Sequence, residues 1–172
     1  MRTLILGGAR SGKSALAERL AHDSDREVIY IATAQAHDAE MAARIAHHRD
    51  GRPAQWLTVE EPRRLADALR MHARADRCVL VDCLTLWLSN LLGAGESAWL
   101  DQRDALLSQL PDLPGTIVLV SNEVGLGVVP MGELSRRFVD EAGRLHQSLG
   151  TRCERVLFIA AGLPLALKGN LP

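Results

Sequence analysis

The feature that most constrains the fold of this chain is a glycine-rich segment near its N-terminus, Gly7–Ser14, which reads GGARSGKS and fits the pattern G-x-x-x-x-G-K-S. An apolar run, Thr3–Leu6, precedes it, and a helix-forming run, Ser14–Leu20, follows it. A strand, a glycine-rich loop and a helix in this order form the phosphate-binding loop (P-loop) of many nucleotide-binding proteins. The composition strengthens the match, because only two lysines stand against eighteen arginines and one of the two is Lys13. The segment therefore predicts a binding site for a nucleoside triphosphate.

The residues of this loop have distinct expected roles. Glycines allow backbone torsions and a close approach that a Cβ atom would obstruct, while successive N–H groups and the helix N-terminus bind phosphate oxygens. We expect the Lys13 ammonium to neutralise charge on the β- and γ-phosphates and the Ser14 hydroxyl to bind Mg²⁺. The residues predicted to contact the nucleotide here are Gly7, Gly8, Ala9, Arg10, Ser11, Gly12, Lys13 and Ser14.

Apolar segments alternate with stretches of helical periodicity along the chain. The predicted strands are Thr3–Leu6, Val28–Ala32, Cys78–Val81, Thr116–Val120 and Arg155–Ala160. Nearly continuous aliphatic runs of this kind are typical of parallel strands that are buried on both faces. The predicted helices are Ser14–His22, Ala39–His48, Arg63–Ala73, Ala98–Leu110 and Leu134–Leu149.

The alternation predicts one α/β domain over residues 1–172, a P-loop NTPase-type (RecA-like), mostly parallel sheet flanked by helices. Ligands should then bind at the carboxyl ends of the strands. In the last predicted helix the side chains expected to face the sheet are Leu134, Phe138, Ala142, Leu145 and Leu149. The segment Gly93–Ser97 is predicted to be a loop.

Composition excludes several classes of protein. The net charge is −1 and the basic residues are dispersed, so nothing favours a nucleic-acid or membrane-surface binder. The three cysteines lack C-x-x-C spacing, and buried thiols are favoured over a disulfide or a metal site. The chain begins directly with a strand and the P-loop, and no apolar run has the length of a membrane span. We therefore expect a cytoplasmic protein.

A carboxylate follows the predicted third strand, where Val79-Leu80-Val81 leads into Asp82. In P-loop proteins an Asp at this position holds Mg²⁺ opposite the Ser of the loop, directly or through water. A carboxylate at a strand end can equally cap the following helix. Given the P-loop, we favour Ser14 and Asp82 as the metal-binding pair.

The segment Asp38–Pro53 ends in two adjacent histidines, His47 and His48, before a Gly-Arg-Pro breaker. Met41, Ile45 and His48 recur at helical spacing, so His48 would share their face while His47 turns away. A neutral imidazole is a competent nucleophile toward phosphorus. The alternative is that the histidines only interact favourably with the negative end of the helix dipole.

Two arginines, Arg49 and Arg52, follow these histidines and can bind phosphate oxygens in bidentate fashion. A zinc site is disfavoured, because adjacent histidines cannot readily share one ion without other ligands nearby. A second polar segment, Ser121–Pro130, follows the fourth predicted strand and carries two glycines. It suits substrate contact or gating, although Asn122-Glu123 can also be a turn that satisfies backbone groups.

Taken together, these segments resemble the bifunctional adenosylcobinamide kinase/adenosylcobinamide-phosphate guanylyltransferase family of cobalamin biosynthesis. The P-loop alone is shared by very many proteins, whereas the run Ile-x-His-His-Arg-Asp-Gly-Arg-Pro is far more particular to this family. The matching segments occur in order along the whole chain: Gly7–Ser14, Tyr30–Ala34, Met41–Pro53, Trp56–Pro62, Val81–Asn90, Ser121–Gly125 and Ala161–Pro164 with Lys168.

The resemblance implies two reactions. In the first, the terminal phosphoryl group of ATP or GTP passes to a hydroxyl of adenosylcobinamide, assisted by Lys13 and Mg²⁺. In the second, a histidine attacks the α-phosphorus of GTP, releases pyrophosphate and leaves a covalent guanylyl-imidazole. The phosphate made in the first step then takes the GMP and forms adenosylcobinamide-GDP. His48 is the expected nucleophile from its helix face, and His47 is the alternative.

The resemblance also implies further nucleotide contacts and an oligomeric state. The additional contacts are Ala32, Thr33, Ala34, Arg49, Asp50, Gly51, Arg52, Glu60 and Asp82. The corrinoid is a small-molecule partner, and enzymes of this family form trimers. The chain departs from the family pattern at His146, where Asn is usual, and some relatives carry Glu in place of Asp82.

Three other functions compete with this interpretation. A nucleotide-binding structural subunit without chemistry would leave His48 and Asp82 unexplained. A plain P-loop kinase of a small metabolite would share the loop but would form no covalent nucleotide. A regulatory GTPase would need an Asn-Lys-x-Asp motif for guanine, and the sequence has none.

Overall fold

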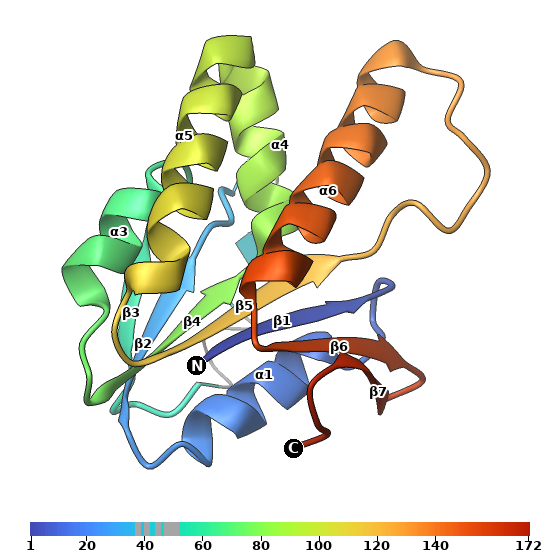
Figure 1. The fold of residues 1–172 in the computed structure, drawn as a ribbon. Helices are drawn as coiled ribbons and strands as arrows, with labels where there is room; N and C mark the ends of the chain where they lie inside the picture. Colours follow the sequence, from blue (N-terminus) through green and yellow to red (C-terminus); the bar gives the residue numbers. More distant parts are fainter. Residues whose placement is uncertain (37–38, 40–41, 44–45, 47–51) are drawn as a thin grey trace.

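One sheet forms the centre of the molecule, with helices packed on both faces (Figure 1). The computed structural model describes residues 1–36, 39, 42–43, 46 and 52–172. The strands in these residues are β1 Arg2–Gly7, β2 Glu27–Ala32, β3 Leu57–Glu60, β4 Arg77–Asp82, β5 Thr116–Asn122, β6 Arg155–Ala160 and β7 Leu163–Lys168. They pair in the order β3-β2-β4-β5-β1-β6-β7.

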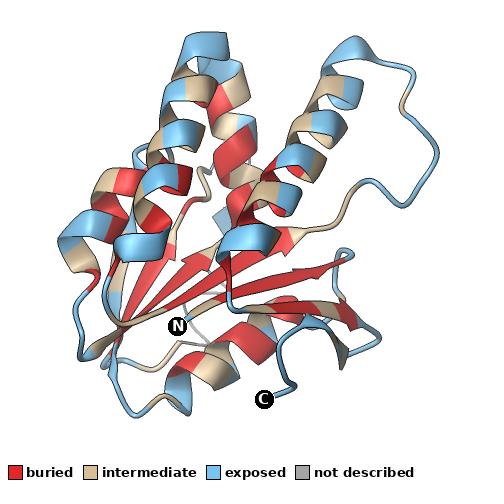
Figure 2. Cartoon of the chain, viewed as in Figure 1, coloured by how far each residue is buried: buried red, intermediate tan, exposed pale blue. Residues whose placement is uncertain are grey.

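All neighbouring strands are parallel except β6 and β7. Gly7, the last residue of β1, pairs with Asn122 of β5 and Ile159 of β6, while Ala32 of β2 pairs with Asp82 of β4. The aliphatic runs of the inner strands are buried, as expected between two helical layers (Figure 2). The carboxyl ends of β1, β2, β4 and β5 thus meet at one edge of the sheet, where ligands bind in open α/β folds.

The helices cover the two faces of the sheet unequally. On one face α1 (Lys13–His22) buries Leu16, Ala17 and Ala21 against the strands. The other face is covered by α3 Leu65–His72, α4 Leu84–Ala94, α5 Glu96–Gln109 and α6 Glu133–Arg152, with a short 3₁₀ helix at Leu110–Asp112 (Figure 1). In this larger core the rings of Trp87 and Trp99 meet edge to face with centroids 5.6 Å apart.

The predicted architecture is confirmed. Each of the five predicted strands is present, and four predicted helices correspond to α1, α3, α5 and α6. The fifth predicted helix, Ala39–His48, falls largely outside the described residues. The three thiols are buried and free, as expected. None of the described helices is long and apolar enough to span a membrane.

Three elements were not predicted, namely β3, β7 and α4. The strand β3 has four residues at a sheet edge, and β7 is a half-exposed antiparallel edge strand containing Pro164, so neither has the long aliphatic run of a buried strand. The helix α4 is apolar around much of its circumference, which hides its helical periodicity.

Two local predictions were wrong. The predicted loop Gly93–Ser97 shrinks to the single residue Gly95, whose φ of 118° lies in a region that favours glycine and allows α5 to begin directly after α4. Leu134 does not face the sheet, since it is 68% exposed. It stands in the first turn of α6, where that helix projects beyond the sheet, whereas Ala142, Leu145 and Leu149 are buried as predicted (Figure 1).

Candidate nucleotide site

The glycine-rich loop connects β1 to α1 by a backbone path that only certain residues allow. Gly12, the residue before α1, has a φ of 100°, and Arg10 is also left-handed with a φ of 54°. A Cβ atom on Gly7 would lie 2.4 Å from the carbonyl oxygen of Ile159. The glycines at 7 and 12 are therefore required by packing and by torsion, which is the geometry of a phosphate-binding loop.

A turn from the far end of the chain supports this loop. The hairpin between β6 and β7 passes beside it, and the N–H of Gly162 donates a hydrogen bond to the carbonyl of Ser11 over 2.9 Å. The contact is tight, since a Cβ atom on Gly12 would lie 3.2 Å from the Cα of Gly162. The loop is thus held by two strands, β1 through its own chain and β6 through the hairpin.

The ammonium group of Lys13 lies inside the loop. Its Nζ donates to the carbonyl of Gly8 over 2.6 Å, and the residue is only 7% exposed. Burial lowers the pKa of Lys13, and the negative charge of Asp82 opposes that shift. An ammonium held in this way by a backbone carbonyl can exchange that contact for phosphate oxygens.

The predicted metal-binding pair is in direct contact. The Ser14 hydroxyl donates to Oδ2 of Asp82 over 2.9 Å, and the Tyr30 hydroxyl donates to the same oxygen over 3.0 Å. Burial, followed by the charge of Asp82, raises the pKa of Tyr30, so the phenol stays a neutral donor.

A hydroxyl and a carboxylate are ligands that Mg²⁺ accepts, together with phosphate oxygens and water. Among the described residues, no group of three or more His, Cys, Asp or Glu side chains could hold a metal ion. The donor set of Ser14 and Asp82 is compatible with the predicted role in binding Mg²⁺.

The end of β2 is fastened to the end of β4. The hydroxyl of Thr33 donates to the carbonyl of Cys83 over 2.7 Å and accepts from the Cys83 N–H over 2.9 Å. The amide of Asn90 then donates to the carbonyls of Thr33 and Pro62. Thr33 is fully buried, and its hydroxyl, its N–H and its carbonyl all take part in hydrogen bonds within the protein, so the residue holds the ends of β2 and β4 together.

Other predicted residues lie along the same edge. Ala32 pairs with Asp82 across β2 and β4, and Ala34 follows in the chain. Glu60 ends β3, and the carbonyl of Ala32 accepts a hydrogen bond from the N–H of Glu61 over 2.9 Å. The sheet order separates Glu60 from the loop by three intervening strands, β2, β4 and β5. Thus the predicted residues at this edge of the sheet are Ala32, Ala34, Asp82 and Glu60, and Glu60 lies farthest from the P-loop.

Arg52 brings the segment after the histidines to this site. Its guanidinium carbon lies 3.5 Å from the centroid of the Tyr30 ring, a cation–π contact. The other predicted residues of that segment, His47, His48, Arg49, Asp50 and Gly51, lie outside the described residues. Arg52 itself therefore lies beside Tyr30, whose phenol contacts Asp82.

A buried polar cluster at the end of β5 was not assembled by sequence reasoning. It contains Thr85, Ser121, Glu123 and His146 from α4, β5, the loop after β5 and α6. The segment Ser121–Glu123 was predicted to matter, but nothing in its pattern pairs it with a residue in α6. The only signal was that His146 departs from the Asn that is usual in the family.

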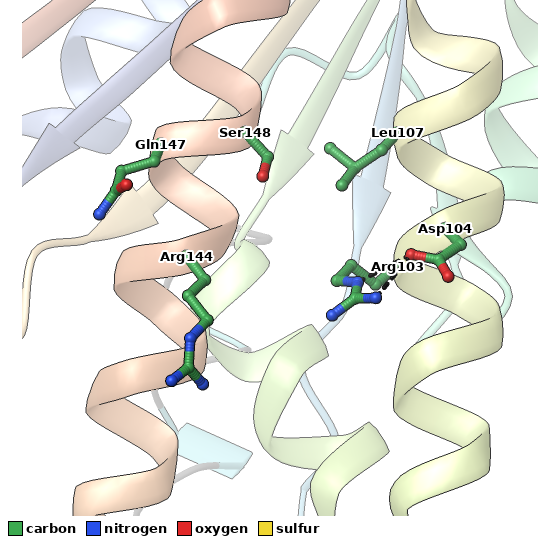
Figure 3. Close-up of a pocket in the computed structure, with 6 residues that line it drawn as sticks. All are labelled: Arg103, Asp104, Leu107, Arg144, Gln147 and Ser148. Carbon is green, nitrogen blue, oxygen red and sulfur yellow. Dashed lines mark hydrogen bonds and ion pairs between the residues drawn. The ribbon is translucent and has the colours of Figure 1, made fainter.

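A separate depression lies in the outer helical layer between α5 and α6 (Figure 3). None of the predicted site residues lines it. Its lining residues are Arg103, Asp104, Leu107, Arg144, Gln147 and Ser148. The candidate site is therefore the edge formed by the P-loop and the neighbouring strand ends.

Comparisons with known proteins agree over almost the whole chain. A protein-family model described as cobinamide kinase / cobinamide phosphate guanyltransferase matches residues 3–167. A relative from Pseudomonas aeruginosa, "Bifunctional adenosylcobalamin biosynthesis protein CobP", is 66% identical over 171 residues, which cover 99% of each chain. The Salmonella typhimurium relative, "Bifunctional adenosylcobalamin biosynthesis protein CobU", is 41% identical over 98% of this chain and 100% of its own.

A solved structure also shares the fold. An ATPase from the type III secretion system of pathogenic bacteria superposes with a TM-score of 0.51 at 13% identity, over 96% of this chain and 57% of that chain. This likeness concerns the architecture alone.

Proposed function

This chain belongs to the cobinamide kinase / cobinamide phosphate guanyltransferase family, and from that premise we propose that it is a bifunctional enzyme of adenosylcobalamin biosynthesis. It phosphorylates adenosylcobinamide and then transfers GMP from GTP to the phosphate it has made. The observation that carries the proposal is the 66% identity with a bifunctional relative over 99% of the chain. A plain small-metabolite kinase, which has only the first activity, is not favoured.

In the kinase step the P-loop holds the triphosphate and Lys13 offsets charge on the transferred phosphoryl group. The contacts that support this role are the burial of Lys13 inside the loop and its hydrogen bond to Gly8. Ser14 and Asp82 would hold Mg²⁺, which supplies further neutralisation of phosphate charge when bound. The acceptor hydroxyl approaches from the carboxyl edge of the sheet.

In the guanylyltransferase step we propose His48 as the nucleophile toward the α-phosphorus of GTP, with His47 as the alternative. The N–P bond forms as the bond to pyrophosphate breaks, and the phosphate of the acceptor later displaces the imidazole. Splitting the transfer in this way avoids a direct encounter between two anions. Arg52, stacked on Tyr30 beside Asp82, supports a location of this segment close to the nucleotide.

We also propose that the remaining predicted contacts serve the nucleotide in one or both steps. They are Gly7, Gly8, Ala9, Arg10, Ser11, Gly12, Ala32, Thr33, Ala34, Arg49, Asp50, Gly51, Arg52 and Glu60. We also propose a cytoplasmic location, which the sequence composition favours, and a trimeric assembly, which the family resemblance implies. Exposed leucines on one face of β7, Leu163, Leu165 and Leu167, support an assembly, and light scattering of the purified protein tests it.

The decisive experiment is the intact mass of the protein after incubation with GTP and Mg²⁺, for the wild type, His47→Ala and His48→Ala. We expect an acid-labile increase equal to one GMP that persists in His47→Ala, disappears in His48→Ala and is discharged by adenosylcobinamide phosphate. If the adduct disappears only in His47→Ala, His47 is the nucleophile. No adduct on any variant, with GTP still consumed when adenosylcobinamide is supplied, would reduce the protein to a plain kinase.

A further inference from the structure

The cluster at the end of β5 contains a run of hydrogen bonds that ends at His146, and the imidazole of His146 then faces the carboxylate of Glu123. The N–H of Asn122 donates to Oγ1 of Thr85 over 2.7 Å, and that hydroxyl lies 3.3 Å from Oγ of Ser121. The Ser121 oxygen lies 2.8 Å from Nε2 of His146, and Nδ1 of the same ring lies 3.5 Å from Oε2 of Glu123. The cluster thus runs from a backbone amide to a carboxylate.

The position of Glu123 indicates which of the two ring nitrogens of His146 carries the proton. If Nε2 held the proton, the lone pair of Nδ1 would face a carboxylate oxygen, which is electrostatically unfavourable. We therefore assign the proton to Nδ1 and let the Ser121 hydroxyl donate to Nε2. Burial lowers the pKa of His146, while Glu123 opposes that shift, and the neutral ring accepts from Ser121 and presents Nδ1 to Glu123 at 3.5 Å.

Glu123 lies directly beside the nucleotide loop. Its N–H donates to the carbonyl of Gly7 over 2.9 Å, so the first residue after β5 is fastened to the first glycine of the P-loop. Its side chain is 20% exposed, and Oε1 accepts from the N–H of Gly125 over 2.6 Å. Held by Gly125 and faced by His146, the carboxylate is fixed in place and still reaches solvent.

The other described carboxylates at this edge are less suited to an acceptor hydroxyl. Asp82 already receives the hydroxyls of Ser14 and Tyr30 on one oxygen and is assigned to Mg²⁺. Glu60 ends β3, which is four strand spacings from β1, or roughly 19 Å at the usual separation. Glu123 follows the strand adjacent to β1 and is the carboxylate nearest in the sheet to the P-loop strand.

We propose that Glu123 is the catalytic base of the kinase step and that His146 is its positioning residue. This rests on the proposed function, since it deepens the mechanism of the same site. The acceptor oxygen forms a bond to the γ-phosphorus as the bond from that phosphorus to the β–γ bridging oxygen breaks. The hydroxyl proton passes to a Glu123 oxygen, and the nucleoside diphosphate leaves with the bridging oxygen. The protonated glutamate then loses its proton to solvent.

The test compares Glu123→Gln with the wild type in both half-reactions. We expect kcat for phosphorylation of adenosylcobinamide to fall about 10²–10⁴-fold, the range for loss of a general base, with little change in KM for the nucleotide. Formation of the GMP adduct from GTP should persist, because that step requires no acceptor hydroxyl. Glu133→Gln, at the exposed start of α6 beyond the same loop, is the matched control.

Substitutions of His146 separate positioning from simple packing. His146→Ala should lower kcat for phosphorylation about 10-fold with little change in KM for the nucleotide, since Glu123 loses the partner that orients it. His146→Asn, which restores an amide donor, should recover most of that loss. A packing role would lower thermal stability in both variants and would leave kcat of the folded protein unchanged in both.

The outcomes distinguish two failures. A wild-type protein that phosphorylates no cobinamide and forms no adduct overturns the proposed function and the role of Glu123 with it. A wild-type protein with both activities whose Glu123→Gln variant keeps its kcat overturns the base assignment alone. A parallel loss of phosphorylation and adduct formation in Glu123→Gln also overturns it, because that pattern indicates damage to the shared nucleotide loop.

Discussion

The guanidinium of Arg52 stacks on the ring of Tyr30, with its carbon 3.5 Å from the ring centroid. The hydroxyl at the far end of this ring donates to the Asp82 oxygen that Ser14 also contacts. The Tyr30 side chain therefore contacts Arg52 through the face of its ring and Asp82, the proposed metal ligand, through its hydroxyl. Tyr30 thus joins Arg52 to the carboxylate proposed to hold Mg²⁺.

Replacing Tyr30 by Phe should separate these two contacts. The variant keeps the aromatic face for Arg52 and loses the hydrogen bond that orients Asp82. Because such supporting hydrogen bonds contribute about 10–100-fold to metal affinity, the Mg²⁺ concentration for half-maximal phosphoryl transfer should rise by about 10-fold or more. A Mg²⁺ titration measures this, with Tyr30→Leu as the variant that loses both contacts. An unchanged titration in Tyr30→Phe would show that the phenol does not orient the ligand.

Replacing Lys13 by Ala should lower phosphoryl transfer by about 10²–10³-fold, the usual cost of removing one donor to a developing charge. Lys13→Arg should not restore activity, because a planar guanidinium does not fit the buried position that a compact ammonium occupies. The other lysine is the control, since Lys168 donates to the carbonyls of Gly150 and Thr151. Equal losses in Lys13→Ala and Lys168→Ala would contradict a specific role for Lys13.

The two glycines at the start of the P-loop should respond differently to alanine. A Cβ atom on Gly7 would collide with the Ile159 carbonyl, whereas one on Gly8 would have no heavy atom within 4 Å. Gly7→Ala should lower the free energy of unfolding by about 1–3 kcal/mol, the usual cost of overpacking. Gly8→Ala should stay within about 0.5 kcal/mol of the wild type. Urea denaturation measures both, and similar values for the two variants would refute the packing argument.

The buried thiols should be inert in the folded protein. Burial raises the pKa of Cys83 to about 11 and that of Cys153 to about 12, and it also raises the pKa of Cys78. At pH 8 the thiolate fraction of Cys83 is then roughly one in a thousand, so iodoacetamide should modify the native protein very slowly and the urea-unfolded chain at all three positions. Mass spectrometry counts the adducts, and rapid labelling of the native protein would disprove this.

The same shifts make folding stability depend on pH at the alkaline end. The thiol pKa values are higher in the folded chain than in the unfolded chain, where they are near 8.5. The contribution of these thiols is therefore fully present below about pH 8.5 and is lost as pH rises toward 11–12. Unfolding midpoints measured between pH 7 and 10 should decline, and replacement of Cys153 by Ala should reduce that decline.

The inner part of the fold was predictable because its strands are long aliphatic runs and its P-loop has a specific spacing. Asp82 could be placed opposite Ser14 because the carboxyl ends of parallel strands meet at one edge. Edge strands such as β3 and β7 carry a weaker pattern, since one face or one end is exposed. Their absence from the prediction therefore has a physical reason.

The polar contacts around the site were only partly predictable. Tyr30 reads as one more apolar residue of β2, and its hydrogen bond to Asp82 depends on the pairing of β2 with β4. The contact of His146 with Glu123 depends on how α6 crosses the sheet, which hydrophobic periodicity does not specify to a single residue. Sequence pattern thus identifies residues with chemical capacity, and tertiary packing decides which of them meet.

The position of β1 between β5 and β6 has a consequence for synthesis on the ribosome. The P-loop is translated before both strands that flank β1 and before the hairpin whose Gly162 supports Ser11, since all of these come from residues 116–168. These pairings join distant parts of the chain. The entropic cost of closing the intervening loops is therefore met only after residues 116–168 have been made. A nascent chain that stops before β6 has the complete nucleotide motif without its native support. We therefore expect the P-loop to reach its native geometry only after β5, β6 and the turn at Gly162 have been synthesised.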